Sequence, residues 1–403
     1  MPQLSLRATQ LPASPIRKLA PFAEAARKRG TKVYHLNIGQ PDIATPPEFF
    51  AAIQEASPEV LEYSHSAGIE LLRQRIVDYY GRWNQQLDLS QVIVTTGASE
   101  ALSMAFSVIL NPEDEVIVPE PFYANYISFA LANSGKVVPV PTTIETDFAL
   151  PSLEAFESRI TPRTRAIMIC NPGNPTGVIY PRAALEALGE IVRKYDLFLI
   201  ADEVYREFNY SDQPCCTALD LPGLQDRVIV VDSISKRFSA CGARIGCIVS
   251  RNAEVMDAVL RLAQARLSPP TLGQIGAAAV YQLPESYYRH VIDQYAGRRD
   301  LLQAALSQMP GVVCPAIDGA FYAMVKLPVA NSDHFCQWML EKFDHQGATV
   351  MMAPGGGFYA TDGCGQDQVR IAYVLKEDDL AAAMEVLAAG LAAYPGTVSM
   401  TSV

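Results

Sequence analysis

Residues 227–246 read RVIVVDSISKRFSACGARIG, and the order of residue types in this stretch predicts where a buried strand meets a ligand. The β-branched run 228–231 is typical of a buried strand, which would end near Asp232. Two serines and Lys236 follow, and Arg244 comes after a glycine-containing loop. Ligands in open α/β sheets bind beyond the carboxyl ends of the strands. We therefore expect a binding site directly after this strand.

The overall composition favours a two-domain enzyme without nucleic-acid or membrane partners. A chain of 403 residues is longer than most domains with a single hydrophobic core, so two domains are expected. The 32 basic and 43 acidic residues leave a net charge of −11, which disfavours binding to nucleic acid or to an anionic membrane surface. The sequence contains no apolar run of the ~18 residues that a membrane span needs, and its first residues lack the apolar core of a signal peptide.

The eight cysteines show neither a CxxC motif nor metal-ligand spacing with the five histidines. We therefore predict reduced, partly buried thiols, no metal site and a cytoplasmic location.

Seven short apolar runs alternate with helical patterns between about residues 90 and 250, which predicts an α/β fold. Most runs are apolar throughout, as is typical of parallel strands that are covered on both faces. Helices are predicted at 98–110 and 182–195. The predicted strands are VIVTT (92–96), EVIVP (115–119), KVVPV (136–140), AIMIC (166–170), LFLIA (197–201), VIVV (228–231) and CIVS (247–250).

The rest of the chain predicts a smaller α+β domain. Helices are expected at 286–308 and 377–393, and strands at 321–327 and 369–374. We place the large domain at 46–284, and we assign the N-terminal arm, 1–45, and residues 285–403 to the small domain.

Polar and aromatic residues follow five of the predicted strands, at the end where a ligand would bind. They are Gly97, Ala98 and Ser99 after the first run, Glu120 to Tyr123 after the second, Asn171 to Gly177 after 166–170, Asp202 to Tyr205 after 197–201, and Ser233, Ser235 and Lys236 after 228–231.

Taken alone, each of these residues also has a structural explanation. Gly97 and Ser99 can form a turn with an N-cap serine, and Lys236 can be a solvated surface lysine. Asp202 can cap a helix, and Asn174 can be a turn residue. Each reading stays open for the single residue.

The combination of residue types is more specific. Arg370 lies in the apolar run VRIAYV (369–374), where a guanidinium needs either a structural carboxylate or a bound anion. Phosphate donors at a helix N-terminus, the aromatic ring of Tyr123, the carboxylate of Asp202 and the amine of Lys236 together describe a pyridoxal 5'-phosphate (PLP) site.

Ordered motifs from the N-terminal arm to the final helix resemble the class I/II aminotransferases, which are PLP enzymes of fold type I. The resemblance implies a mainly parallel seven-stranded sheet in a large domain beside a smaller α+β domain. The matching segments are LNIGQPDIATP (36–46), YSHSAGIELLR (63–73), NPGNPTG (171–177), ADEVY (201–205), SISKRFSACGARIG (233–246), GAFY (319–322) and PGGGF (354–358).

The resemblance also implies a role for each matching residue. Lys236 would attach the cofactor covalently and move the proton of the substrate Cα, and Asp202 would keep the pyridine nitrogen protonated. Arg370 would bind the substrate α-carboxylate. The other implied contacts are Gly39 and Asn174 with that carboxylate, Asn174 and the catalytic Tyr205 with the phenolic oxygen, Tyr123 with the ring face, Ala98, Ser99, Ser233 and Arg244 with the phosphate, and Tyr63 with the phosphate of a partner subunit.

The implied activity is transfer of an amino group from an L-amino acid to a 2-oxo acid by a ping-pong mechanism, in a cytoplasmic homodimer with shared active sites. We expect aspartate as the donor and 2-oxoglutarate as the acceptor. Two positions depart from the family: Tyr359 stands where glycine is common after PGGGF, and Ser99 stands where some aspartate-specific members carry lysine.

The sequence leaves some alternative functions open and disfavours others. A C–S β-lyase and an aromatic or alanine aminotransferase would use the same fold. A non-catalytic ligand sensor is disfavoured because the sequence carries no DNA-binding extension. A dehydrogenase is disfavoured because TTGASEA (95–101) lacks G-x-G-x-x-G.

Overall fold

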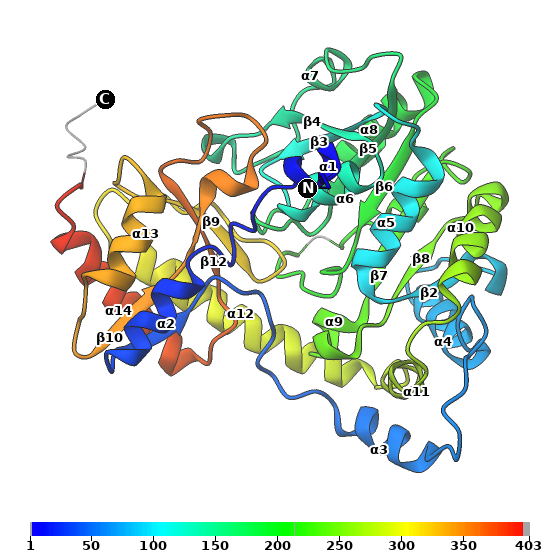
Figure 1. Ribbon diagram of the computed structural model, residues 1–403, viewed down its shortest axis with the longest axis horizontal. Helices are drawn as coiled ribbons and strands as arrows, with labels where there is room; N and C mark the ends of the chain where they lie inside the picture. Colours follow the sequence, from blue (N-terminus) through cyan, green and yellow to red (C-terminus); the bar gives the residue numbers. More distant parts are fainter. Residues whose placement is uncertain (1, 213, 398–403) are drawn as a thin grey trace.

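A seven-stranded sheet forms the centre of the larger part of the molecule in the computed structural model, which describes residues 2–212 and 214–397 (Figure 1). The strand order is β2-β8-β7-β6-β5-β3-β4, and β8 alone runs against the others. The predicted mainly parallel α/β sheet is therefore confirmed. The strands are β2 (Val92–Thr95), β3 (Glu115–Glu120), β4 (Lys136–Pro141), β5 (Thr164–Cys170), β6 (Phe198–Asp202), β7 (Val228–Ser233) and β8 (Gly246–Val249).

Helices cover both faces of this sheet, which explains the uninterrupted apolar runs. In β7, Val228 and Val230 belong to the core on one face, whereas Ile229 and Val231 belong to the core on the other. All four side chains are at most 1% exposed. The first face packs against α4 (Glu70–Gly81), α8 (Arg182–Lys194) and α11 (Thr271–Val280), and the second against α5 (Gly97–Ile109), α6 (Asn125–Ala132) and α10 (Ala253–Arg266).

Two smaller sheets form a second region beside the large sheet, to the left in Figure 1. The apolar core of this second region also includes residues of the loop that follows β6, such as Tyr205 and Phe208. The sheets are β11-β12-β9 and β1-β10, with β1 (Lys32–His35), β9 (Tyr322–Lys326), β10 (Ala348–Met351), β11 (Ala353–Pro354) and β12 (Gln368–Ala372); the helices are α2 (Ala20–Lys28), α12 (Glu285–Ser307), α13 (Ser332–Glu341) and α14 (Glu377–Ala393).

The predicted helices and strands all occur, with ends shifted by one or two residues. The pairing of β1 with β10 was not predicted, because each strand has only four residues and its partner is distant in the sequence. No helix in the described ranges is long and apolar enough to cross a membrane.

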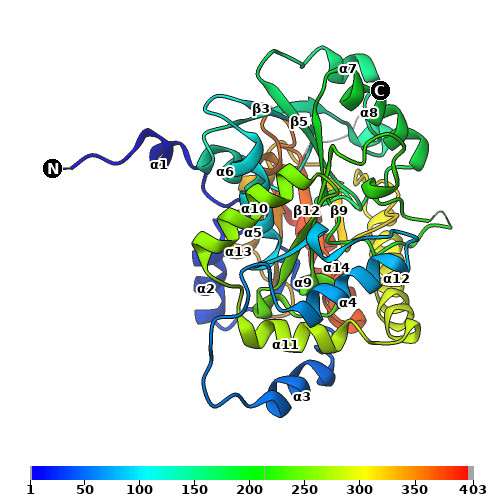
Figure 2. The same ribbon diagram turned by 90° about the vertical axis from the view of Figure 1, so that its right-hand side faces the viewer.

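The remaining helices are mostly short. Figure 2 shows α1 (Leu6–Gln10) standing away from the body, which it contacts through Arg7. Helix α3 (Pro47–Ala56) packs against α11, while α7 (Leu153–Glu157) and α9 (Ile234–Arg237) are single short turns.

A buried ionic network ties the ends of β6 and β7 to α9. Arg237 donates two hydrogen bonds to Asp232, and Arg206 donates to Glu203 from Nε at 2.9 Å. Arg206 also lies 3.9 Å from Asp232. All four side chains are at most 2% exposed, so water screens none of these interactions.

We predict that Arg237→Met destabilises the protein much more than loss of a surface pair. The substitution leaves the buried carboxylate of Asp232 with Arg206 alone, and breaking a buried pair costs about 3–5 kcal/mol. Arg227→Met is the control, because its partner Asp196 is 86% exposed and such pairs contribute less than about 1 kcal/mol. Urea denaturation of both variants tests this; equal losses of unfolding free energy would contradict it.

Candidate active site

One cavity of about 680 Å³ lies at the carboxyl ends of β6 and β7, and all the predicted site residues except Tyr63 line it. Its volume is within the roughly 300–1,000 Å³ of small-molecule sites. The predicted residues that it brings together are Gly39, Ala98, Ser99, Tyr123, Asn174, Asp202, Tyr205, Ser233, Lys236, Arg244 and Arg370.

Donors for an anion gather at one part of the cavity wall. The first N–H groups of α5, at Ala98 and Ser99, have no acceptor within their own helix and carry the positive end of its dipole. Gly97 has φ +74°, and a Cβ there would lie 2.3 Å from the guanidinium of Arg244. Ser233 lines the same cavity, and its hydroxyl lies 2.8 Å from that of Ser235 and 2.9 Å from the carbonyl of Ile245. This arrangement suits a phosphate.

Asp202 ends β6 as a buried carboxyl at the wall of the cavity. Tyr126 donates a hydrogen bond to its Oδ2 at 2.7 Å, and the Val204 N–H donates to its Oδ1 at 3.3 Å. Burial raises the pKa of Asp202 to about 6, although these hydrogen bonds act in the opposite direction. Among the described residues, no cation forms an ion pair with it. A protonated ring nitrogen would be a matching partner.

Lys236 lies on the short helix α9 and extends its amine into the cavity. Its Nζ donates a hydrogen bond to the carbonyl of Gly39 at 2.7 Å and lies 4.0 Å from the sulfur of Cys241. The side chain is half-buried, so the interpretation as a solvated surface lysine is wrong. In the described residues no carboxylate pairs with this amine.

Arg370 is 1% exposed, and the structure decides between its two possible partners. Its guanidinium donates to the side-chain oxygen of Asn174 at 3.0 Å and to the carbonyl of Asn37 at 2.6 Å, and none of the described carboxylates pairs with it. Burial lowers the pKa of Arg370 from its ordinary value. The guanidinium stacks on Tyr322 and Phe358. A structural salt bridge is therefore not its role, and an anion remains the partner that it lacks.

Aromatic hydroxyls line the space between these charges. The hydroxyls of Tyr205 and Tyr322 are 2.9 Å apart, and Tyr123 accepts a hydrogen bond from Asn125 at 2.8 Å.

Several lining residues escaped the sequence prediction. Ser235 was noted beside Ser233 but not assigned to the site, and Tyr322 closes the quoted motif GAFY. Tyr126, which holds Asp202 from outside the lining, is positioned only by the packing of α6, so no local signal identifies it. The other unpredicted lining residues are Ser14, Ile16, Arg17, Ile38, Gln40, Leu102, Asn125, Val204 and Cys241.

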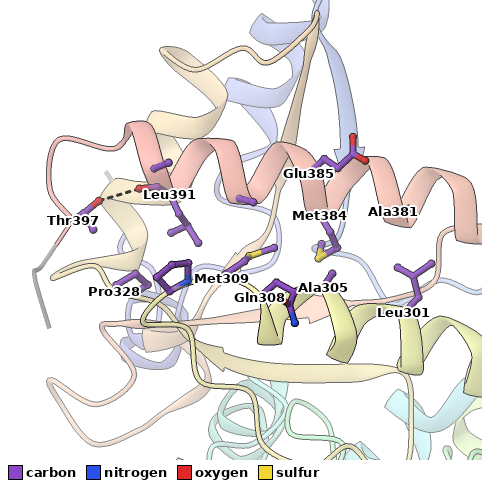
Figure 3. A pocket seen from close by; sticks show the side chains of 13 residues that line it. Leu301, Ala305, Gln308, Met309, Pro328, Ala381, Met384, Glu385, Leu391 and Thr397 are labelled. Carbon is purple, nitrogen blue, oxygen red and sulfur yellow. Dashed lines mark hydrogen bonds between the residues drawn. The ribbon is translucent and has the colours of Figure 1, made fainter.

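Two residues and one hollow lie outside the cavity. Tyr63 is 78% exposed, and Tyr359 donates its hydroxyl to Gln368 at 2.7 Å. A separate hollow of about 510 Å³ between α12 and α14 is lined mainly by apolar residues such as Met384 and Leu391 (Figure 3). Among the described residues that line it, Glu385 is the only charged one, and none is a predicted site residue.

The family model for "Aminotransferase class I and II" matches residues 31–387. The chain belongs to this family. It is therefore a PLP-dependent aminotransferase of fold type I, as the resemblance implied.

Individual relatives agree with this assignment. The chain is 31% identical over 394 residues to an aspartate aminotransferase of Bacillus subtilis, covering 95% of this chain and 97% of the relative. It is 36% identical over 308 residues to an arginine–pyruvate transaminase of Pseudomonas aeruginosa, covering 76% and 78%. The crystal structure of an aspartate aminotransferase from Thermotoga maritima superposes with a TM-score of 0.89 at 30% identity, covering 97% of this chain and all of the other.

The cavity of this aminotransferase fits PLP by its own chemistry. The donors at α5 and Arg244 match a phosphate, the unpaired carboxyl of Asp202 matches a pyridinium, and the amine of Lys236 faces the same space. When bound, PLP withdraws electrons from the substrate Cα and so eases removal of its proton.

We predict that Asp202 makes the cofactor-free aminotransferase less stable as the pH rises. Its pKa of about 6 in the folded protein exceeds the roughly 3.9 of an unfolded chain, so the folded state binds more protons between about pH 4 and pH 6. Unfolding free energy therefore falls across this window, by about 3 kcal/mol for a difference of roughly two units.

Asp202→Asn should lose this dependence. The measurement is urea denaturation of both cofactor-free proteins at about pH 4 and about pH 7. Wild type should lose about 3 kcal/mol relative to the variant as the pH rises. If the difference in unfolding free energy between the two proteins stays constant with pH, burial does not raise the pKa of Asp202.

Proposed function

We propose that this aminotransferase takes aspartate as its amino donor and 2-oxoglutarate as its acceptor. One observation carries the proposal: in the described part of the chain, four basic side chains and a single carboxyl line the cavity, which favours dianionic substrates. The lining basic residues are Arg17, Lys236, Arg244 and Arg370, and the carboxyl is that of Asp202. Relatives named aspartate aminotransferase support the same choice.

We assign the substrate α-carboxylate to Arg370. Its buried guanidinium lacks a carboxylate among the described residues, and Asn174 already holds one of its nitrogens in place. A bidentate contact with two carboxylate oxygens would complete it. Since donor and acceptor both carry this carboxylate, the same contact serves both half-reactions.

The amine of Lys236 would accept the proton that leaves the substrate Cα and, as an ammonium, would later donate a proton back. The carboxylate of Asp202 would pair with the pyridine nitrogen of PLP, and Tyr205 and Asn174 would hydrogen-bond its phenolic oxygen. The short helix α9 and the network at Arg237 hold Lys236 at the cavity wall.

We also propose that the enzyme is a homodimer in which Tyr63 reaches the partner's phosphate site. Large apolar side chains that are 49–78% exposed gather near α3 and α4, as expected of a surface that is covered in solution. They are Phe50, Val60, Leu61, Tyr63, Leu71 and Leu267. Sedimentation that finds only monomers at micromolar concentration would contradict this.

The division at 46–284 against the remainder and a cytoplasmic location also stay proposals. The eight cysteines are all free, which agrees with a reducing compartment. A disulfide found by peptide mapping of native protein would oppose that location.

The activity itself has a direct test. The PLP-loaded enzyme should form oxaloacetate and glutamate from aspartate and 2-oxoglutarate, with parallel-line ping-pong kinetics, faster than with other common donors. Lys236→Ala should lose all turnover, and borohydride should label only the peptide that carries Lys236 in wild type. Ammonia release without an acceptor would favour the C–S lyase instead, and preference for alanine or an aromatic donor would overturn the donor assignment.

Loss of Arg370 should remove discrimination between substrates with and without an α-carboxylate. Arg370→Lys should lower kcat/KM by at least about a hundredfold for aspartate and for 2-oxoglutarate, because a charge-assisted bidentate contact contributes roughly 3–5 kcal/mol. The reaction with 3-aminopropanoate, which is aspartate without its α-carboxylate, should hardly change.

Arg298→Lys is the matched control for this experiment. Arg298 is also a buried arginine, but it pairs with Asp42 at 2.7 Å and lies outside the cavity lining. Its loss should lower the melting temperature without changing the preference for aspartate over 3-aminopropanoate. An Arg370→Lys enzyme that keeps the wild-type preference would show that the α-carboxylate binds elsewhere.

A further inference from the structure

The N-terminal arm places an arginine at the cavity whose side chain has no partner. Arg17 lines the cavity together with Ser14 and Ile16 of the same arm. Its guanidinium makes no hydrogen bond or ion pair within the described ranges 2–212 and 214–397. The other three basic residues of the lining already have a task in the proposed chemistry, so Arg17 is the one left unassigned.

The backbone around Arg17 is held firmly, although its side chain is not. The carbonyl of Ile16 accepts a hydrogen bond from Asn37 at 2.8 Å, and the carbonyl of Asn37 accepts one from Arg370 at 2.6 Å. Two consecutive hydrogen bonds therefore connect the arm to the residue that we assign to the α-carboxylate. The arm and Arg370 keep a defined relative position.

Packing on both sides of Arg17 reinforces this position. A Cβ on Gly357 would lie 2.2 Å from the side chain of Pro15, so the arm can approach this loop only because the loop carries glycine. On the other side, Lys18 pairs with Asp333, and Leu19 is 4% exposed. A guanidinium that is presented by an anchored segment loses less freedom on binding an anion than one on a loose tail.

The charges of the cavity indicate which ligand group Arg17 receives. Among the described lining residues the only carboxyl is that of Asp202, which is 5% exposed and held by Tyr126, so it is not available to Arg17. Ser99 stands where some aspartate-specific members of the family carry lysine, and thus that position supplies no charge for a second carboxylate.

We propose that Arg17 determines substrate specificity by binding the side-chain carboxylate of dicarboxylic substrates, while Arg370 holds the α-carboxylate. This inference rests on the proposed function and names the residue that reads the substrate side chain. A basic amino donor such as arginine would place its positively charged side chain beside Arg17. No carboxylate of the described lining is available to pair with that charge, so the site disfavours such a donor.

Kinetics of the PLP-loaded enzyme test the proposal. Arg17→Ala should lower kcat/KM for aspartate and glutamate at least about tenfold, and for alanine less than about twofold, since alanine has no second carboxylate. Arg17→Lys should recover part of the loss. Arg17→Glu should lose aspartate further and should improve the relative rate with arginine. Arg27→Ala is the control: it is an exposed arginine of α2, outside the lining, and should leave all donors within about twofold.

Calorimetric binding to the loaded enzyme gives a readout that is independent of turnover. Succinate should bind wild type at least about tenfold more tightly than it binds Arg17→Ala, whereas butyrate, with one carboxylate, should bind both alike. If wild type fails to transaminate any amino acid, the proposed function fails. If wild type prefers aspartate and Arg17→Ala keeps both that preference and the succinate affinity, only the assignment of Arg17 is overturned. Equal losses for aspartate and alanine would also overturn it, because they would mean that the arm has been displaced.

Discussion

A buried network of two arginines and two carboxylates links the ends of β6 and β7 to helix α9, and the geometry of the cavity depends on it. Every member is the immediate neighbour in sequence of a cavity residue, so a shift of the network shifts the site. The high cost of leaving one of these charges unpaired keeps the four backbone positions together. The pairs, each with the cavity residue first and the network residue second, are Asp202 and Glu203, Tyr205 and Arg206, Ser233 and Asp232, and Lys236 and Arg237.

The cavity itself contrasts with this compensated network. Asp202 and Arg370 are both buried, yet neither forms an ion pair with a described residue. Burial without an ionic partner disfavours the charged form of each side chain, as the directions of their pKa shifts indicate. Folding alone does not account for two such groups in one space. A cofactor with a cationic ring nitrogen and a substrate with a carboxylate would supply the missing partners.

The N-terminal arm belongs to the site although it is distant from it in sequence. It packs against the glycine-rich loop at Gly357 and is hydrogen-bonded through Asn37 to Arg370. The wall of the cavity is thus built from the ends of large-sheet strands, from β12 and from the arm together. With the role that we propose for Arg17, a substitution in the arm would change substrate specificity without altering the residues that we assign to the cofactor.

The sequence by itself determined the seven strands, their burial on both faces and the residues at their carboxyl ends. These features are local. An apolar β-branched run such as 228–231 can occupy any interior position of a parallel sheet that is covered on both faces, and the residues after it then lie at the carboxyl edge of that sheet. The family resemblance added the cofactor and the reaction.

Only the tertiary structure decided that Arg370 has no structural carboxylate, that Tyr126 holds Asp202, and that β1 pairs with β10. It also brought Arg17 to the cavity. These contacts join segments that are separated by tens to hundreds of residues. No local pattern encodes which of several polar groups a buried charge will meet, because that choice is made by the packing of whole elements against one another.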